Sequence, residues 1–280
     1  MVPLLILGAV PFVMVLGNSM LIPLFPKMGE AMDLTPFQVG LLITAFSIPA
    51  GIVIPFAGAV SDHIGRRLIM APALILYGAG GFVAGAAAIL LTQPYGWVLA
   101  GRIIQGIGAG GTYQLAMALV GDLLQGGKRT QALGWLEAAN GLGKVASPVV
   151  GSLVALIVWY AAFFTYGLLA LPVAVAVWFL VPEGEERPKQ SPGKYVKGLA
   201  AIFKARGVQL GACYAIGASA LFLLFGLLSY VSDDLEARFG LTGLIIGLAV
   251  AVPVAASSVM AFTFGTLLQS RPKWARPTIL

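Results

Sequence analysis

The sequence has 280 residues, of which 59% are hydrophobic and 10% are charged, and its net charge is +6. About 25% of the residues of soluble domains are charged, so this composition excludes an ordinary water-soluble fold. No basic helix or aromatic-basic patch favours binding to nucleic acid. The excess of basic residues is therefore interpreted by the charge pattern that is typical of membrane proteins.

Eight apolar runs, each bounded by charged or turn-forming residues, predict helices that cross a membrane. Such a helix needs about 20 residues, and continuous apolar runs favour helices over the alternating strands of a membrane barrel. No basic region precedes the first run, so it is predicted to be a span and not a removable signal peptide. The predicted spans are 2–25, 37–60, 68–91, 97–120, 131–154, 160–181, 208–231 and 241–268.

The basic residues outside the spans gather in the even-numbered connections and after the last span. The odd-numbered connections contain only Lys27 and Arg238, together with acidic residues. By the positive-inside rule, the even connections and the amino terminus are predicted to be cytoplasmic. We expect an integral protein of the bacterial cell (inner) membrane. The basic residues on the predicted cytoplasmic side are Arg66, Arg67, Lys128, Arg129, Arg187, Lys189, Lys194, Lys197, Lys204, Arg206, Arg271, Lys273 and Arg276.

The predicted fold is an all-α polytopic membrane protein. Residues 1–182 form an amino-terminal six-helix bundle in this prediction, and residues 183–206, rich in charge and proline, form a cytoplasmic linker. Residues 207–280 contain about two spans. We therefore expect a partial carboxy-terminal bundle, truncated relative to the first.

The loop between the second and third spans, GAVSDHIGRR, carries the most specific motif. Gly58 is expected to let helices approach each other, and Gly65 to permit a tight turn. Asp62 can hold an arginine at the helix end, with Arg66 and Arg67 as candidates. His63 is expected to face solvent and not to be catalytic. The alternative is a basic loop with an incidental capping aspartate.

The fourth span contains GRIIQG, which places Arg102 and Gln105 inside an apolar helix. A charged side chain there costs about 2.5 kcal/mol or considerably more, so Arg102 is a candidate functional residue. The alternative is a structural arginine that donates hydrogen bonds to carbonyl groups.

Two patterns overlap in the fifth span. Its segment GLGKVASPVVGS contains small residues and a proline, which permit close helix packing and a bend. Spacings of three, four and seven residues also place Glu137, Asn140 and Lys144 on one helix face. Glu137 and Lys144 are roughly 10 Å apart along the axis, so no direct pair is expected.

These polar residues suggest a pathway for a substrate and a proton. We hypothesise that Arg102 and Lys144 form a positive cavity for an anionic or zwitterionic substrate, and that Glu137 exchanges a proton. Asn18, a polar residue in the first span, is added to the same pathway. The alternative is a static network of buried charges that holds helices together.

Three of these motifs resemble signatures of the major facilitator superfamily, and they occur in the expected order. They are G-x-x-x-D-x-x-G-R-R/K in the loop, R-x-x-Q-G in the fourth span, and the antiporter signature G-x-x-x-G-P-x-x-G-G in the fifth. The last keeps Gly143, Pro148 and Gly151 but has Ser147 and Ser152 where glycine is expected.

The resemblance implies two six-helix bundles, built from inverted repeats, that rock around a substrate site near the membrane midplane. It makes the loop a conformational latch between the bundles, in which Asp122 can join Asp62 and Arg66. The alternative for Asp122 is a simple carboxylate at a helix end. It also favours a secondary transporter for proton-coupled efflux of a small amphiphilic drug or secreted metabolite. Uptake or facilitated diffusion is one alternative, and a non-transporting truncated fragment is another.

No enzyme is expected, because the sequence has no HExxH, no phosphate-binding loop and no Ser/His/Asp arrangement. The expected energy source is the proton gradient, with no cofactor, metal site or nucleic-acid partner. The single cysteine, Cys213, excludes an intrachain disulfide and is interpreted as a packing residue.

Overall fold

The chain folds as a helical bundle in a computed structural model, which describes residues 2–184, 192–241, 245–249, 251–256 and 259–260. All regular secondary structure in these ranges is helical, which confirms the predicted all-α class. The elements are α1 (Val2–Ser19), η1 (Ile22–Leu24), α2 (Phe25–Met32), α3 (Pro36–Ile64), α4 (Arg66–Leu90), α5 (Tyr95–Gly110), α6 (Tyr113–Leu123), α7 (Gly126–Val154), α8 (Ala161–Leu180) and α9 (Pro192–Phe239).

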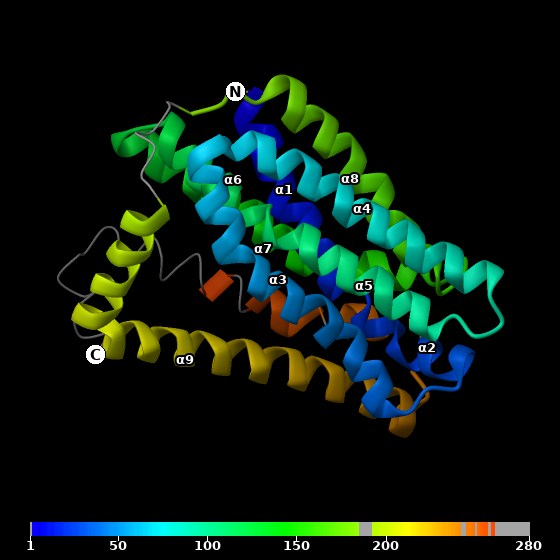
Figure 1. Cartoon of the computed structure of the whole chain (residues 1–280). Helices are drawn as coiled ribbons and strands as arrows, with labels where there is room; N and C mark the ends of the chain where they lie inside the picture. Colours follow the sequence, from blue (N-terminus) through cyan, green and yellow to red (C-terminus); the bar gives the residue numbers. More distant parts are fainter. Residues whose placement is uncertain (1, 185–191, 242–244, 250, 257–258, 261–280) are drawn as a thin grey trace.

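The first bundle is built from α1 to α8 (Figure 1). Helix α4 packs against α5 and α8, α1 packs against α7 and α8, and α3 packs against α5. The long helix α9 bends at Arg206, which has non-helical backbone angles, and runs along one side of the bundle (Figure 1).

Six helices within the described ranges are long and apolar enough to cross a membrane. Helix α7 has sufficient length, at 29 residues, but it is not among them. Its charged and polar side chains lower its mean hydropathy, and three of the uncharged ones, Asn140, Ser147 and Ser152, are buried. The six helices are Val2–Met32, Pro36–Ile64, Arg66–Leu90, Tyr95–Leu123, Ala161–Leu180 and Ala200–Leu228.

Two predicted spans are interrupted. The first continues past Ser19 through η1 into α2, and Pro23 and Pro26 lie where the new helices begin, because proline lacks an N–H donor. The fourth is divided between α5 and α6 at residues 111 and 112. Periodicity alone does not show either break, since both sides remain apolar.

The carboxy-terminal part contains helical structure that the sequence did not predict. The predicted linker 183–206 overlaps α9, which already begins at Pro192. The eighth predicted span, 241–268, includes the short helix Ile245–Ala256, while residues 261–268 lie outside the described ranges. Cys213 is exposed on α9, so its interpretation as a packing residue is wrong for the part of the protein that is described.

Helices α1 and α7 meet through small residues spaced four apart. A Cβ atom added to Gly151 would lie 2.2 Å from the Met20 carbonyl oxygen. One turn earlier, the Ser147 hydroxyl donates a hydrogen bond of 2.8 Å to the Leu16 carbonyl. Gly143 continues this row against the backbone of α1. Ser147 therefore preserves the close contact that glycine would provide and adds a hydrogen bond between the helices.

This contact predicts that Gly151→Ala lowers stability by about 1–3 kcal/mol, because the new methyl group overpacks the interface. Gly134→Ala on the same helix is the matched control, since its Cβ meets no atom within 4 Å. It should be neutral or slightly stabilising. The midpoints of thermal unfolding of the two variants in detergent, monitored through the loss of the monodisperse peak, would be compared. Equal midpoints for both variants would contradict the predicted contact.

Candidate functional site

A cluster of charged residues joins three helix ends. Arg66, at the start of α4, pairs with Asp62 at the end of α3 with an N–O distance of 2.8 Å. Its Nε also donates a hydrogen bond to Asp122 near the end of α6. The side chains of Arg66 and Asp122 are only 9% and 10% exposed, so water screens this pair weakly. The structure thus brings together the three charges of the predicted latch.

A fourth helix is connected to the cluster by Glu183, which follows α8. Its two carboxylate oxygens accept hydrogen bonds from the backbone N–H groups of Arg66, at 2.7 Å, and Arg67, at 3.0 Å. These N–H groups lie in the first turn of α4, where intrahelical acceptors are missing and negative charge is favourable. The Arg67 guanidinium returns a hydrogen bond to the Val181 carbonyl. Sequence analysis placed Glu183 only in the linker.

The two glycines of this loop have different roles. Gly65 has a φ of +113°, and a Cβ there would lie 2.8 Å from a carboxylate oxygen of Glu183. Glycine is therefore required both by backbone conformation and by space. No described atom lies within 4 Å of a Cβ added at Gly58, so the expected close helix approach at Gly58 is not found. His63 is half-buried, with Nδ1 2.8 Å from the Ala59 carbonyl oxygen on its own helix.

Arg102 is fully buried inside the bundle. Its Nε donates to the Leu42 carbonyl at 3.1 Å, and its Nη1 donates to Gln105 Oε1 at 3.0 Å. The guanidinium carbon lies 4.5 Å from the centroid of the Phe46 ring. Hydrogen bonds and a cation–π contact therefore compensate for the loss of hydration. This geometry corresponds closely to the structural alternative considered for this arginine.

Two buried tyrosines lie near Arg102. The rings of Tyr77 and Tyr166 are 6.2 Å apart, and neither hydroxyl has a hydrogen-bond partner within the described residues. A Cβ at Gly17 on α1 would lie only 1.4 Å from the Tyr77 hydroxyl oxygen. The absence of a side chain at Gly17 therefore allows the Tyr77 hydroxyl to contact α1.

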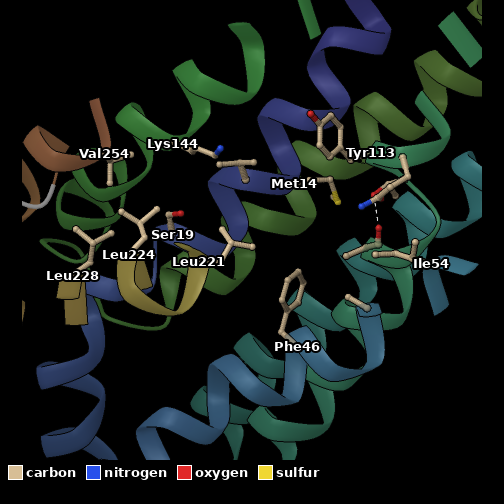
Figure 2. Close-up of a pocket in the computed structure, with 15 residues that line it drawn as sticks. Met14, Ser19, Phe46, Ile54, Tyr113, Lys144, Leu221, Leu224, Leu228 and Val254 are labelled. Carbon is tan, nitrogen blue, oxygen red and sulfur yellow. Dashed lines mark hydrogen bonds between the residues drawn. The ribbon is translucent and has the colours of Figure 1, made fainter. Parts of the chain in front are cut away.

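A cavity of about 210 Å³ lies between the first bundle and α9 (Figure 2). Its wall is mainly apolar, with Met14 from α1, Phe46 from α3, and Leu221 and Leu224 from α9. Lys144 from α7 is the one charged side chain among the described residues that line it. A largely apolar cavity with few polar groups is the usual form of a small-molecule site.

The residues predicted to form one pathway lie in separate parts of the bundle. Lys144 lines the cavity, whereas Arg102 does not, because it lies behind Phe46, whose ring contacts its guanidinium. The expectation that Arg102 and Lys144 share one cavity is therefore corrected. Gln105 stays with Arg102 in the core. Asn18 lies on α1, but its side chain is outside the described part of the structure.

Glu137 and Asn140 lie outside the cavity lining, on the same helix as Lys144. The hydroxyl of Tyr113, at the start of α6, donates a hydrogen bond of 2.6 Å to Glu137 Oε2. Asn140 is buried, and its Oδ1 has no partner in the described residues. No ion pair between Glu137 and Lys144 is found among the described side chains, as their spacing predicted.

Three residues that contribute to these sites, Glu183, Phe46 and Tyr113, were not predicted from the sequence. Glu183 could have been noticed as a carboxylate directly after a span, on the side where basic residues gather. Phe46 and Tyr113 had no such signal. Phe46 resembles any other apolar helix residue, and the position of Tyr113 depends on a helix break that periodicity does not reveal.

The contacts of Glu183 predict a graded loss of stability. Glu183→Ala removes both acceptors from the start of α4 and should cost about 1–3 kcal/mol, while Glu183→Gln keeps one acceptor and should cost less. Glu30→Gln, at an exposed residue of α2, is the control. The midpoints of thermal unfolding in detergent would show the order of stability of these variants. Equal midpoints for Glu183→Ala and the control would refute a capping role.

Comparison with known proteins places these features in a family. Residues 7–280 match the Major Facilitator Superfamily. The chain is 40% identical over 262 residues to the bacillibactin exporter of Bacillus subtilis (strain 168), covering 92% of this chain and 65% of that protein. It is 30% identical over 264 residues to the class C tetracycline resistance protein of Escherichia coli, covering 89% and 62%.

Solved structures share the fold. A bacterial homologue of the human lysosomal transporter Spinster, inward-facing and unoccupied, has a TM-score of 0.76 at 19% identity, covering 96% of this chain and 63% of that one. The D-xylose–proton symporter has a TM-score of 0.71 at 15% identity, covering 96% and 68%. This chain spans somewhat less than two thirds of the relatives' lengths given above. These matches, with the motifs and geometry described, show that the chain belongs to the major facilitator superfamily.

Proposed function

We propose that this protein is a secondary transporter that exports a small amphiphilic compound by alternating access. The observation that carries the proposal is the apolar cavity with Lys144 in its wall, situated between the first bundle and α9. Exporters and drug-resistance proteins among its relatives support the outward direction. The small-residue contact between α1 and α7, formed by the antiporter-type segment, supports it as well.

The proposed substrate is anionic or zwitterionic. Lys144 places a positive charge in an apolar wall, where the attraction between opposite charges is weakened less than in water. The apolar lining suits the hydrophobic part of an amphiphile. Bacillibactin, the compound named for the relative with 40% identity, is therefore the first substrate to test.

The proposed orientation places the amino terminus and the Arg66 cluster in the cytoplasm. The distribution of basic residues supports it, since they gather in the even connections. Figure 1 shows the amino terminus at the end of the bundle where α8 ends, near the junction of α3 and α4. In this orientation the cluster of Asp62, Arg66, Asp122 and Glu183 would act as a cytoplasmic latch in the bacterial inner membrane.

Transport of bacillibactin into proteoliposomes tests the substrate proposal. Lys144→Gln should raise KM about tenfold, which corresponds to the loss of about 1.4 kcal/mol of attraction to an anion. Lys128→Gln is the control, because Lys128 is exposed on the same helix outside the cavity. Unchanged KM in Lys144→Gln would remove the anion-binding role. No flux with any variant would support the alternative that this chain alone does not transport.

Coupling to protons is proposed to involve Glu137. With a proton gradient imposed on oriented vesicles, we expect substrate-dependent proton flux during counterflow, with substrate and proton moving in opposite directions. Movement of substrate and proton in the same direction would favour uptake instead of export. Glu137→Gln should abolish accumulation against a gradient while leaving downhill exchange. A Glu137→Gln variant that still accumulates substrate with normal pH dependence would eliminate the proton-carrier role.

A further inference from the structure

Tyr113 connects the cavity to Glu137. Its side chain lines the cavity together with Lys144 (Figure 2), and its hydroxyl donates a hydrogen bond of 2.6 Å to Glu137 Oε2. Glu137 itself does not line the cavity within the described residues. One side chain thus belongs both to the proposed substrate site and to the surroundings of the carboxylate.

The backbone at Tyr113 is fixed by the break between α5 and α6. A Cβ added to Gly110 would lie 2.7 Å from the Val53 Cβ on α3, and one added to Gly111 would lie 2.9 Å from the Ala73 Cβ on α4. The Thr112 hydroxyl donates a hydrogen bond of 2.7 Å to the Ala109 carbonyl. The break is therefore held by close packing on two helices. Only side-chain rotation remains to decide where the Tyr113 ring lies.

The Tyr113 hydroxyl selects that rotation through its hydrogen bond to Glu137, with Asn140 as a second polar neighbour from the same helix. A phenol that donates to a carboxylate forms a charge-assisted bond, which is stronger than the same bond to a neutral acceptor. Tyr113 is only half-buried beside the cavity, so without this bond other staggered rotamers become accessible to its ring. The carboxylate can therefore influence a bound substrate without touching it.

We propose that Glu137 is a positioning residue that holds the Tyr113 ring in the cavity wall, and that Tyr113 selects substrates carrying an aromatic ring beside an acidic group. An aromatic wall favours stacked or edge contacts with a flat ring, and Lys144 in the same wall favours the acid. Phe46 and Met14, which also line the cavity, suit the same kind of ligand. This inference rests on the proposed role of the cavity as a substrate site.

A purely structural role for the hydrogen bond, linking α6 to α7, predicts a different dependence. In that case replacement of either Glu137 or Tyr113 would lower stability. The effect of one replacement on ligand binding would then not depend on whether the other residue had been replaced. The test therefore measures whether the effect of Glu137 on the cavity requires the Tyr113 hydroxyl.

Equilibrium binding of bacillibactin to the detergent-purified chain, measured by calorimetry, provides the first readout. Glu137→Ala should weaken binding about threefold to tenfold, and Glu137→Gln, which retains a neutral acceptor, should restore part of the loss. In the Tyr113→Phe background neither replacement should have a further effect. If Glu137→Ala keeps its full effect in that background, the positioning role is overturned.

A second readout needs no ligand. Ile54 lines the cavity with Tyr113 (Figure 2), and the single native cysteine can be removed by Cys213→Ser. In that background the thiol introduced by Ile54→Cys reports access to the cavity through its rate of alkylation by N-ethylmaleimide. Glu137→Ala and Tyr113→Phe should each change the rate in the same direction, and together they should change it no further than either does alone. Unchanged or additive rates would overturn the proposal.

Tyr95→Phe is the matched control for both readouts, because the Tyr95 hydroxyl donates to the Gln38 carbonyl outside the cavity. It should leave binding and alkylation unchanged. The two readouts also separate the proposals from each other. Failure of the native protein to bind bacillibactin would count against the proposed substrate, whereas the alkylation rates would still decide whether Glu137 positions Tyr113.

Discussion

A guanidinium group inside a membrane protein must find its partners within the helix bundle, since the hydrocarbon around it offers none. Arg66 and Arg102 meet this requirement in different ways. Arg66 lies at the end of the bundle and pairs with two carboxylates from other helices. Arg102 lies in the core and uses a backbone carbonyl, an amide side chain and an aromatic face. Both arrangements require several helices to be correctly placed at once, so each arginine links elements that are distant in the sequence.

The two arginines stabilise different parts of the bundle. The contacts of Arg102 connect α5 to α3 and leave Phe46 between the charge and the cavity, so the cavity wall is apolar at that point. The contacts of Arg66 and Glu183 connect the ends of α3, α4, α6 and α8. The core arginine therefore stabilises the wall, while the peripheral cluster lies where the chain leaves the bundle toward α9.

Sequence patterns predicted the helical class and the pairing of Arg66 with Asp62 for a physical reason, whereas the contact with Asp122 was expected only from the family resemblance. Apolar runs of sufficient length and a charge motif with fixed spacing are local properties, and both survive folding unchanged. The cavity was less accessible to such reasoning. Lys144 was identified because it is a charge in an apolar run, but Arg102 has the same property and lies elsewhere. Which side of a helix faces a cavity depends on the neighbouring helices, and a single sequence does not record their packing. The same limit concealed Glu183, whose partners lie 117 and 116 residues away.

The break between α5 and α6 shows why such information cannot be recovered from hydropathy. Gly110 and Gly111 are compatible with a continuous membrane helix, yet their lack of side chains allows α3 and α4 to approach at that point. The approach leaves Thr112 outside helical geometry and begins a new helix at Tyr113. The backbone position from which the Tyr113 side chain projects is therefore determined by glycine contacts at the break before its own helix, and its hydrogen bond to Glu137 orients the ring. Because these glycines have no side chain and do not line the cavity, their influence on it is geometric. In the proposed substrate site, substitutions at these glycines would alter ligand recognition while leaving every residue of the cavity wall chemically unchanged.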